Sequence, residues 1–165
     1  MTRQIYKGDM LTRTVIKNNI LRIWNLTEGE ERRDWYGEAL DWATAHADDI
    51  GVSKVCGVIA ALSPVKTWEQ NLVCAKDMLE TGDCGHMQQF KDKADRILKS
   101  DGSDEAILDI LNGNKISAFY LNIRYPNKAN AITIDRHALS VALGRWVTDS
   151  DYQGMTGKQY EFCCR

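Results

Sequence analysis

The stretch between Asp109 and Arg145 constrains the fold more than any other part of the chain. An apolar helix end at residues 106–111 meets Asn112-Gly113, a dipeptide typical of tight turns. A second helix follows at once, because apolar residues recur with the i, i+3, i+4, i+7 spacing of one helical face, at Ile116, Phe119, Tyr120 and Ile123. The pattern predicts two helices joined by a tight corner.

The corner itself predicts an anion site. We expect Gly113 to take a positive φ, which glycine adopts at low cost. The backbone N–H groups that follow, beginning at Asn114, lie at the positive end of the second helix and suit a phosphate. Farther along, the β-like run 131–134 predicts at most one short strand pair. Asp135 then stands where a helix N-cap belongs.

This segment resembles the helix-hairpin-helix DNA glycosylase superfamily, in particular its endonuclease III-like branch. The hairpin of that family ends in Gly-x-Lys and leads into a helix with an Asn near its end, which Gly113, Lys115 and Asn122 match. About twenty residues after the lysine the family has Asp-x-His at the start of the next helix, where this chain has Asp135-Arg136-His137. One position departs from the pattern: Leu111 occupies the place of the first hairpin glycine.

The resemblance extends backwards to a helix, a Leu-Ser turn and a second helix with Asn and Ala-Lys, and covers residues 52–147 in all. Leu62-Ser63, Asn71 and Ala75-Lys76 match these positions. In the family, the loop after the serine often carries a Gln that fills the space left by an extruded base. Here Val65 stands at that position, and an apolar wedge can fill an unstacked gap by shape alone. Alternatively, Pro64 and Val65 only end a buried helix.

The resemblance implies the residues of a catalytic site. Cleavage of an N-glycosidic bond builds positive charge on the sugar, and a nearby carboxylate, here Asp135, stabilises it. The bifunctional members of the family use the hairpin lysine, here Lys115, to form a Schiff base and then eliminate the 3′ phosphate. The ordinary alternatives are a helix cap for Asp135 and a surface lysine for Lys115.

The same resemblance implies a DNA interface and a base pocket. The expected DNA contacts come from two loops and from the helix after Asp135: Gly113, Asn114, Ser63, Val65, Lys66, Arg136 and His137. The expected stacking partners of a flipped base are Trp68, Tyr120 and Tyr125. The stripe positions of Trp68 and Tyr120 favour core packing instead, which leaves Tyr125 as the freer candidate.

Helical periodicity in most segments predicts an all-α fold, a compact multi-helix bundle. We expect one domain over residues 1–165, with N-terminal helices at 1–50, the helix-hairpin-helix core at 52–147 and a C-terminal helix at 148–165. A length of 165 residues suits a single domain, and the sequence contains neither an internal repeat nor a low-complexity linker.

The composition limits the partners. The net charge of −2 argues against tight, general DNA binding. Lysine and arginine side chains are nevertheless frequent between Lys115 and Arg145, and they predict either a basic face or a mixed, solvated surface. The five cysteines lack zinc-site spacing, and too few follow Asp135 for the iron–sulfur loop of some relatives. We expect no metal, no cofactor, no membrane span, a cytoplasmic location (the host cytoplasm if the chain is phage-encoded) and a monomer.

The sequence thus predicts a DNA base glycosylase with an AP-lyase step, acting on a flipped base in double-stranded DNA. It is a hydrolase-type function in base excision repair. Two alternatives remain: an enzyme of the same fold that modifies or exchanges bases, as small divergent phage-encoded relatives do, and a non-catalytic DNA-binding hairpin module or structural bundle.

Overall fold

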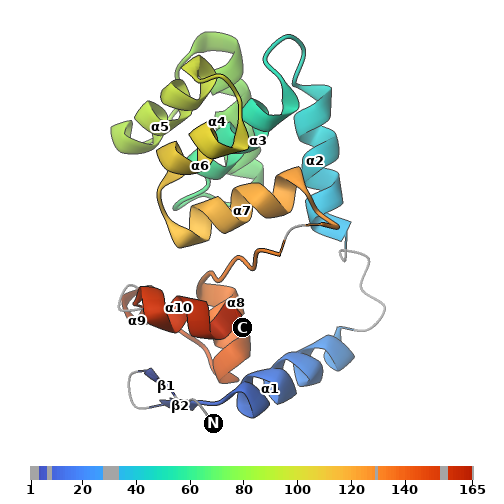
Figure 1. Ribbon diagram of the computed structural model, residues 1–165, viewed down its shortest axis with the longest axis vertical. Helices are drawn as coiled ribbons and strands as arrows, with labels where there is room; N and C mark the ends of the chain where they lie inside the picture. Colours follow the sequence, from blue (N-terminus) through green and yellow to red (C-terminus); the bar gives the residue numbers. More distant parts are fainter. Residues whose placement is uncertain (1–3, 7–8, 28–33, 129, 153–155, 165) are drawn as a thin grey trace. The chain divides into compact units, whose positions relative to one another are not determined.

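The computed structural model describes residues 4–6, 9–27, 34–128, 130–152 and 156–164 (Figure 1). The chain divides into two compact units, a central unit of residues 34–131 and a terminal unit made of residues 1–33 and 132–165. This division differs from the expected boundaries near residues 51 and 147, because helices from the two ends of the chain pack together. The described residues confirm an all-α fold with a small β-hairpin.

The central unit consists of six helices around α3. They are α2 (Trp35–Ala45), α3 (Val52–Leu62), α4 (Trp68–Thr81), α5 (Gln88–Lys99), α6 (Asp104–Leu111) and α7 (Asn114–Arg124). Helix α3 is apolar from Val55 to Leu62 and packs against each of the other five. A helix that is apolar on all sides is stable only when it is surrounded in this way.

Two helices of this unit, α4 and α6, begin with a side-chain cap. Thr67 accepts a hydrogen bond from the Gln70 N–H, and the Gln70 side chain accepts one from the Thr67 N–H, a complete capping box before α4. Ser103 caps α6 through the Ala106 N–H. Helix α4 ends at Gly82 in the left-handed conformation, which satisfies the Met78 carbonyl.

The terminal unit joins the two ends of the sequence. Its elements are β1 (Gln4–Tyr6), β2 (Asp9–Leu11), α1 (Arg13–Leu26), α8 (Arg136–Leu143), α9 (Asp149–Tyr152) and α10 (Gly157–Cys164). The strands form an antiparallel hairpin that the sequence analysis did not anticipate. Helix α1 packs against α8, and the Asn19 side chain donates to the Ala142 carbonyl at 2.9 Å.

Residues 131–134, where the sequence allows at most one short strand pair, belong to no sheet. Tyrosine hydroxyl groups from α9 and α10 take the place of a neighbouring strand. Tyr160 accepts from the Ile134 N–H at 3.0 Å and donates to the Ile132 carbonyl at 2.9 Å. Tyr152 donates to the Ile134 carbonyl at 2.6 Å. The backbone that leads into Asp135 is thereby held from two sides.

Candidate functional site

The α6–α7 hairpin has the expected helices but a different corner. Asn112, not Gly113, takes the left-handed conformation, with φ 42° and ψ 55°, and its N–H donates to the Leu108 carbonyl at 3.0 Å. Gly113 is extended, with φ −169°, so the expected positive φ at this glycine is wrong. Asparagine tolerates the left-handed region and replaces glycine as the residue that ends a helix.

A side chain at Gly113 would fit the fold. A Cβ built there lies 3.5 Å from Ile116 Cγ1 and 3.8 Å from the Leu111 carbonyl oxygen, which are ordinary contacts. Leu111, at the position of the missing family glycine, is buried in the core. Neither the backbone angle nor the space therefore requires glycine at 113, and only the close approach of another molecule would.

A lysine from α5 supports the corner. Lys93 Nζ donates to the Leu111 carbonyl, the last residue of α6, and burial followed by the nearby Arg96 charge lowers the pKa of Lys93. Lys93 and Leu111 are 18 residues apart, so sequence reasoning missed this contact. A cation at a helix C-terminus satisfies a carbonyl and interacts favourably with the helix dipole.

Lys115 is the second residue of α7 and is half-buried, and Asn114 beside it is exposed. On a helix surface, residues four apart are neighbours. Lys115 therefore lies one turn before Phe119, on the side of α7 that borders the apolar stripe. This position combines a partly accessible amine with an apolar neighbour, as the proposed nucleophile requires.

The loop between α3 and α4 carries an unusual residue. Val65 has φ 62°, a region that a β-branched side chain adopts only under strain, and 80% of its surface is exposed. Ser63 at the start of the loop donates to the Ala60 carbonyl at 2.9 Å, and Thr67 at its end caps α4. Two anchored ends thus hold an apolar side chain out in solvent.

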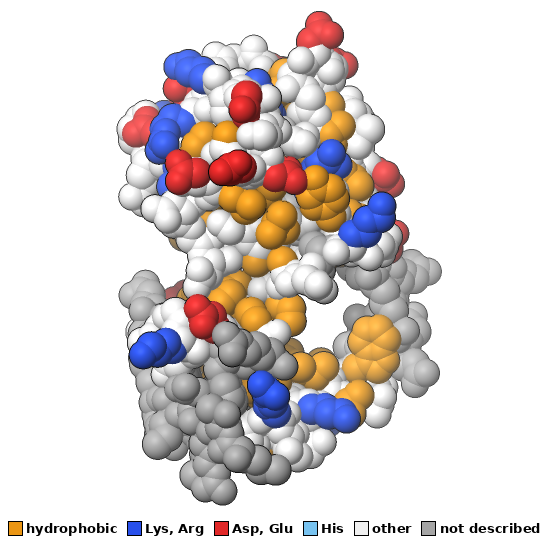
Figure 2. Space-filling model, in the orientation of Figure 1, with side chains coloured by type: hydrophobic (Ala, Val, Ile, Leu, Met, Phe, Trp, Pro, Cys, Tyr) orange, Lys and Arg blue, Asp and Glu red, His pale blue; other side chains and the backbone are white. Residues whose placement is uncertain are grey.

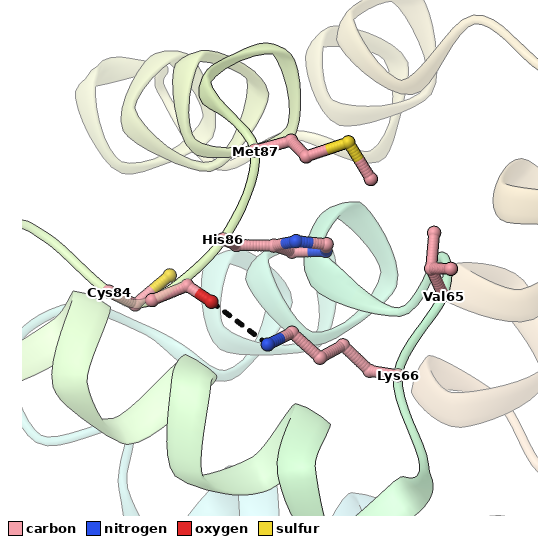
Figure 3. Close-up of a pocket in the computed structure, with 6 residues that line it drawn as sticks. Val65, Lys66, Cys84, His86 and Met87 are labelled. Carbon is pink, nitrogen blue, oxygen red and sulfur yellow. Dashed lines mark hydrogen bonds between the residues drawn. The ribbon is translucent and has the colours of Figure 1, made fainter.

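A shallow pocket of about 500 Å³ lies between this loop and the α4–α5 loop (Figure 3). It is lined by Val65, Lys66, Cys84, Gly85, His86 and Met87. Lys66 Nζ donates to the Gly85 carbonyl at 2.9 Å, which ties the two loops together. The pocket therefore pairs two exposed apolar side chains, Val65 and Met87, with a lysine at its base.

His86 is the residue of this pocket that the sequence analysis overlooked. Burial lowers its pKa, as does the Lys66 charge, whereas hydrogen bonds to the Pro64 and Leu62 backbone act in the opposite direction. Its ring packs on Phe90, with ring centroids 4.7 Å apart. Within the described part of the chain, its buried Nε2 atom has no hydrogen-bond partner. The His86 side chain therefore lies beside the loop that carries Val65 (Figure 3).

Two of the three expected base-stacking residues make hydrogen bonds within the central unit. Tyr120 is wholly buried and donates its hydroxyl to Asp104 Oδ1, and burial, followed by that bond, raises its pKa. The core position favoured by its stripe spacing is thus confirmed. Tyr125 donates to Asp104 Oδ2 at 2.6 Å, which is the main cause of its raised pKa. Arg124, beside it, donates to Ser53 Oγ at 3.0 Å.

The third, Trp68, belongs to a group of rings that the sequence analysis did not assemble. Its ring centroid lies 4.4 Å from that of Trp35, which in turn lies 5.7 Å from Phe119 and 5.0 Å from Tyr36. The rings come from α2, α4 and α7 and are all half-buried. Figure 2 shows apolar side chains gathered over α7 and beside α2 on the face in view.

Asp135 is the N-cap of α8, as the sequence predicts. Its Oδ1 atom accepts the Ala138 N–H at 2.7 Å, which fixes the orientation of a half-buried carboxylate. The two expected DNA contacts that follow are engaged within the terminal unit. Arg136 pairs with Asp149 at 2.9 Å and lies over the Trp146 ring at 4.7 Å, and His137 meets the same ring edge-on at 5.9 Å.

The expected site residues fall in both units. Lys115 and the 63–67 loop belong to the central unit, and Asp135, Arg136 and His137 belong to the terminal unit. The charge is divided unequally between the units. The central unit has 15 acidic and 10 basic residues, and the terminal unit has 8 acidic and 11 basic residues. Positive charge therefore collects in the terminal unit, where α1 carries three bases and no acid.

Two features are absent from the residues that the structure describes. No group of three His, Cys, Asp or Glu side chains there is arranged to hold a metal ion. In the same residues, no helix combines the length and the apolar character needed to cross a membrane.

The fold and hairpin define an all-α protein in two units, with a helix-turn-helix corner in one and a capped carboxylate in the other. The chain belongs to a family of unknown function (DUF7178), whose model matches residues 2–163. No curated protein matches the sequence. No solved structure matches the chain.

Proposed function

We propose that the protein is a DNA base glycosylase with an associated AP-lyase step. The observation that carries the proposal is the α6–α7 hairpin with Lys115 in the first turn of α7, half-buried beside an apolar stripe. The capped carboxylate of Asp135, in an extended segment held by two tyrosines, supports it.

A reaction of this class uses a carboxylate and a lysine in succession, and the resemblance gives these roles to Asp135 and Lys115. As the bond between C1′ and the base breaks, the base leaves with the electron pair and takes up a proton, while Asp135 stabilises the positive charge on the sugar. The Lys115 amine forms a bond to C1′, and opening of the sugar ring, whose oxygen takes up the proton released from the nitrogen, gives an imine. Loss of a proton from C2′ then expels the 3′ phosphate, and water releases the lysine.

The loop that carries Val65 has a role in base extrusion, the step that precedes bond cleavage. Extrusion of a base leaves a gap in the stack, and an apolar side chain can fill it. Val65 is held outward by a backbone conformation that costs on the order of 1–3 kcal/mol. Such strain is commonly retained where it serves binding, and Lys66 beside it carries the charge for a phosphate.

Borohydride trapping tests the proposal. The purified protein is incubated with duplexes that contain an abasic site or one of a panel of modified pyrimidines and purines, and sodium borohydride reduces any imine to a stable protein–DNA adduct. We expect an adduct with the abasic duplex and with at least one modified base, and none with Lys115→Gln. DNA binding without any adduct would favour the non-catalytic hairpin module.

A further inference from the structure

Four aromatic rings of the central unit, those of Trp35, Tyr36, Trp68 and Phe119, form one group. Tyr36, Trp68 and Phe119 pack against the buried core, and the half-buried Trp35 ring packs on Trp68 and Phe119. The planes of Trp35 and Phe119 are inclined by 31°, and those of Trp35 and Trp68 by 56°. Trp35 is therefore the outer ring of the group, supported from beneath by rings on two other helices.

The group borders both predicted DNA-contacting segments of its own unit. Trp68 is the first residue of α4, directly after the loop that carries Val65 and Lys66. Phe119 lies one helical turn beyond Lys115 on α7. Trp68 and Phe119 are 33 and 84 positions away from Trp35 in the sequence. Their contacts with the Trp35 ring link it to the helix that follows the loop and to the second helix of the hairpin.

Two of the residues expected to stack on a base, Tyr120 and Tyr125, are engaged in other contacts. Tyr120 is wholly buried, and the Tyr125 hydroxyl is bonded to Asp104. The four rings carry only two indole N–H groups and the Tyr36 hydroxyl, so their surface is mostly that of ring faces and edges. Stacking of a base on an aromatic side chain contributes about 1–3 kcal/mol per base and tolerates every base.

We infer that Trp35, supported by Trp68 and Phe119, is the surface on which an unpaired nucleobase stacks, with a preference for purines. This inference rests on the proposed function, because it supposes that the protein extrudes a base. The preference follows from size, since the two fused rings of a purine overlap an indole more completely than the single ring of a pyrimidine does. Recognition by overlap gives a graded preference instead of selection for one hydrogen-bonding pattern.

The test measures affinity for duplexes with a single-nucleotide bulge. The bulged nucleotide is a purine, a pyrimidine or tetrahydrofuran, an abasic analogue that resists lyase chemistry. We expect the wild type to bind the purine bulge about tenfold more tightly than the tetrahydrofuran bulge, with the pyrimidine between them. Trp35→Ala should reduce the tenfold increment to twofold or less and leave affinity for the tetrahydrofuran bulge unchanged.

Two further variants separate stacking from general damage. Trp35→Phe keeps a ring and should retain part of the increment. Trp42→Ala removes a tryptophan from the same helix, where its ring stacks on His46 at 3.9 Å, and should keep the whole increment. The melting temperature of each variant is measured alongside.

The outcomes distinguish the inference from the function on which it rests. An increment that survives in Trp35→Ala, or that falls equally in Trp42→Ala, would overturn the stacking role. Equal wild-type affinity for all bulges, together with base release in an activity assay, would overturn the inference and leave the glycosylase standing. A Trp35-dependent increment without any base release or imine would exclude the glycosylase and leave a base-binding protein.

Discussion

Tyr125, which ends α7, donates its hydroxyl to the Asp104 carboxylate, the first residue of α6, at 2.6 Å. The two helices of the hairpin are therefore tied at their open ends as well as at the corner. The other Asp104 oxygen accepts from Tyr120, so both oxygens of this carboxylate are occupied by tyrosines of α7 and its C-cap.

We expect Tyr125→Phe to lower the free energy of unfolding by about 1–2 kcal/mol, because a hydrogen bond to a charged group is lost while the ring stays. Urea denaturation measures the change. Tyr36→Phe is the matched control, since Tyr36 contacts Trp35 and Phe119 through its ring, and should change stability by less than about 0.5 kcal/mol. Equal losses in the two variants would show that the Asp104 bond contributes nothing measurable.

The hairpin corner gives a second prediction. Asn112→Ala should cost about 1 kcal/mol, because Asn112 occupies the left-handed region that alanine disfavours. Gly113→Ala should stay within about 0.5 kcal/mol of the wild type, because its backbone is extended and the added Cβ meets only ordinary contacts. Thermal denaturation of both variants measures the two losses of stability. A larger loss in Gly113→Ala than in Asn112→Ala would indicate that Gly113, and not Asn112, has the positive φ.

Gly113→Ala also tests the phosphate site without the confounding effect of unfolding. If a phosphate approaches the N-terminus of α7, the added methyl group should weaken DNA binding severalfold at unchanged melting temperature. Unchanged affinity for an abasic duplex would mean that the backbone after Gly113 makes no close phosphate contact.

The helices and the cap of α8 were predictable from the sequence, because these depend on residues within one or two turns. The spacing of Ile116, Phe119 and Ile123 defined α7, and Asp135 was identified as the α8 cap. The contacts that were missed join distant positions. The tyrosine bonds to residues 132–134 come from helices nearer the C-terminus, and no local pattern indicates that Trp35 meets Phe119.

The backbone conformation of the hairpin corner was predicted wrongly for a different reason. Asparagine and glycine both tolerate the left-handed region, and the dipeptide Asn112-Gly113 does not show which of them takes it. The division into two units was also hidden, because the sequence has no low-complexity linker and the two segments of the terminal unit lie about a hundred residues apart.

Val65 gives a prediction in which stability and function move in opposite directions. Val65→Gly should raise the free energy of unfolding by about 1 kcal/mol, because glycine adopts a φ of 62° without strain. The same variant should release bases more slowly, because nothing fills the gap left by the extruded base. Denaturation and a base-release assay are run in parallel. Higher stability with undiminished activity would assign Val65 to the loop alone.

His86 predicts a pH dependence of stability. Burial and the Lys66 charge hold its pKa in the folded protein below the ordinary value of 6.5, so between the two pKa values the unfolded chain binds more protons. Stability contributed by the neutral ring is therefore present above pH 6.5 and declines as the pH falls below it. Unfolding free energies measured at about pH 7.5, 6.5 and 5.5 give this slope.

His86→Asn should flatten the slope in that window. His137→Asn, which changes an exposed histidine of the terminal unit, should keep the slope of the wild type. A slope that persists in His86→Asn and disappears in His137→Asn would show that His137, and not His86, causes the pH dependence.

The most direct test of the glycosylase mechanism is a single-turnover assay that records base release and strand cleavage separately for the wild type, Lys115→Gln and Asp135→Asn. The Asp135→Asn substitution retains a side-chain oxygen that can cap α8, so the melting temperature of that variant should be unchanged. We predict that Asp135→Asn slows base release by about 100- to 1000-fold, and that Lys115→Gln abolishes strand cleavage but leaves slow base release. Wild-type rates of base release and cleavage in both variants would contradict the mechanism.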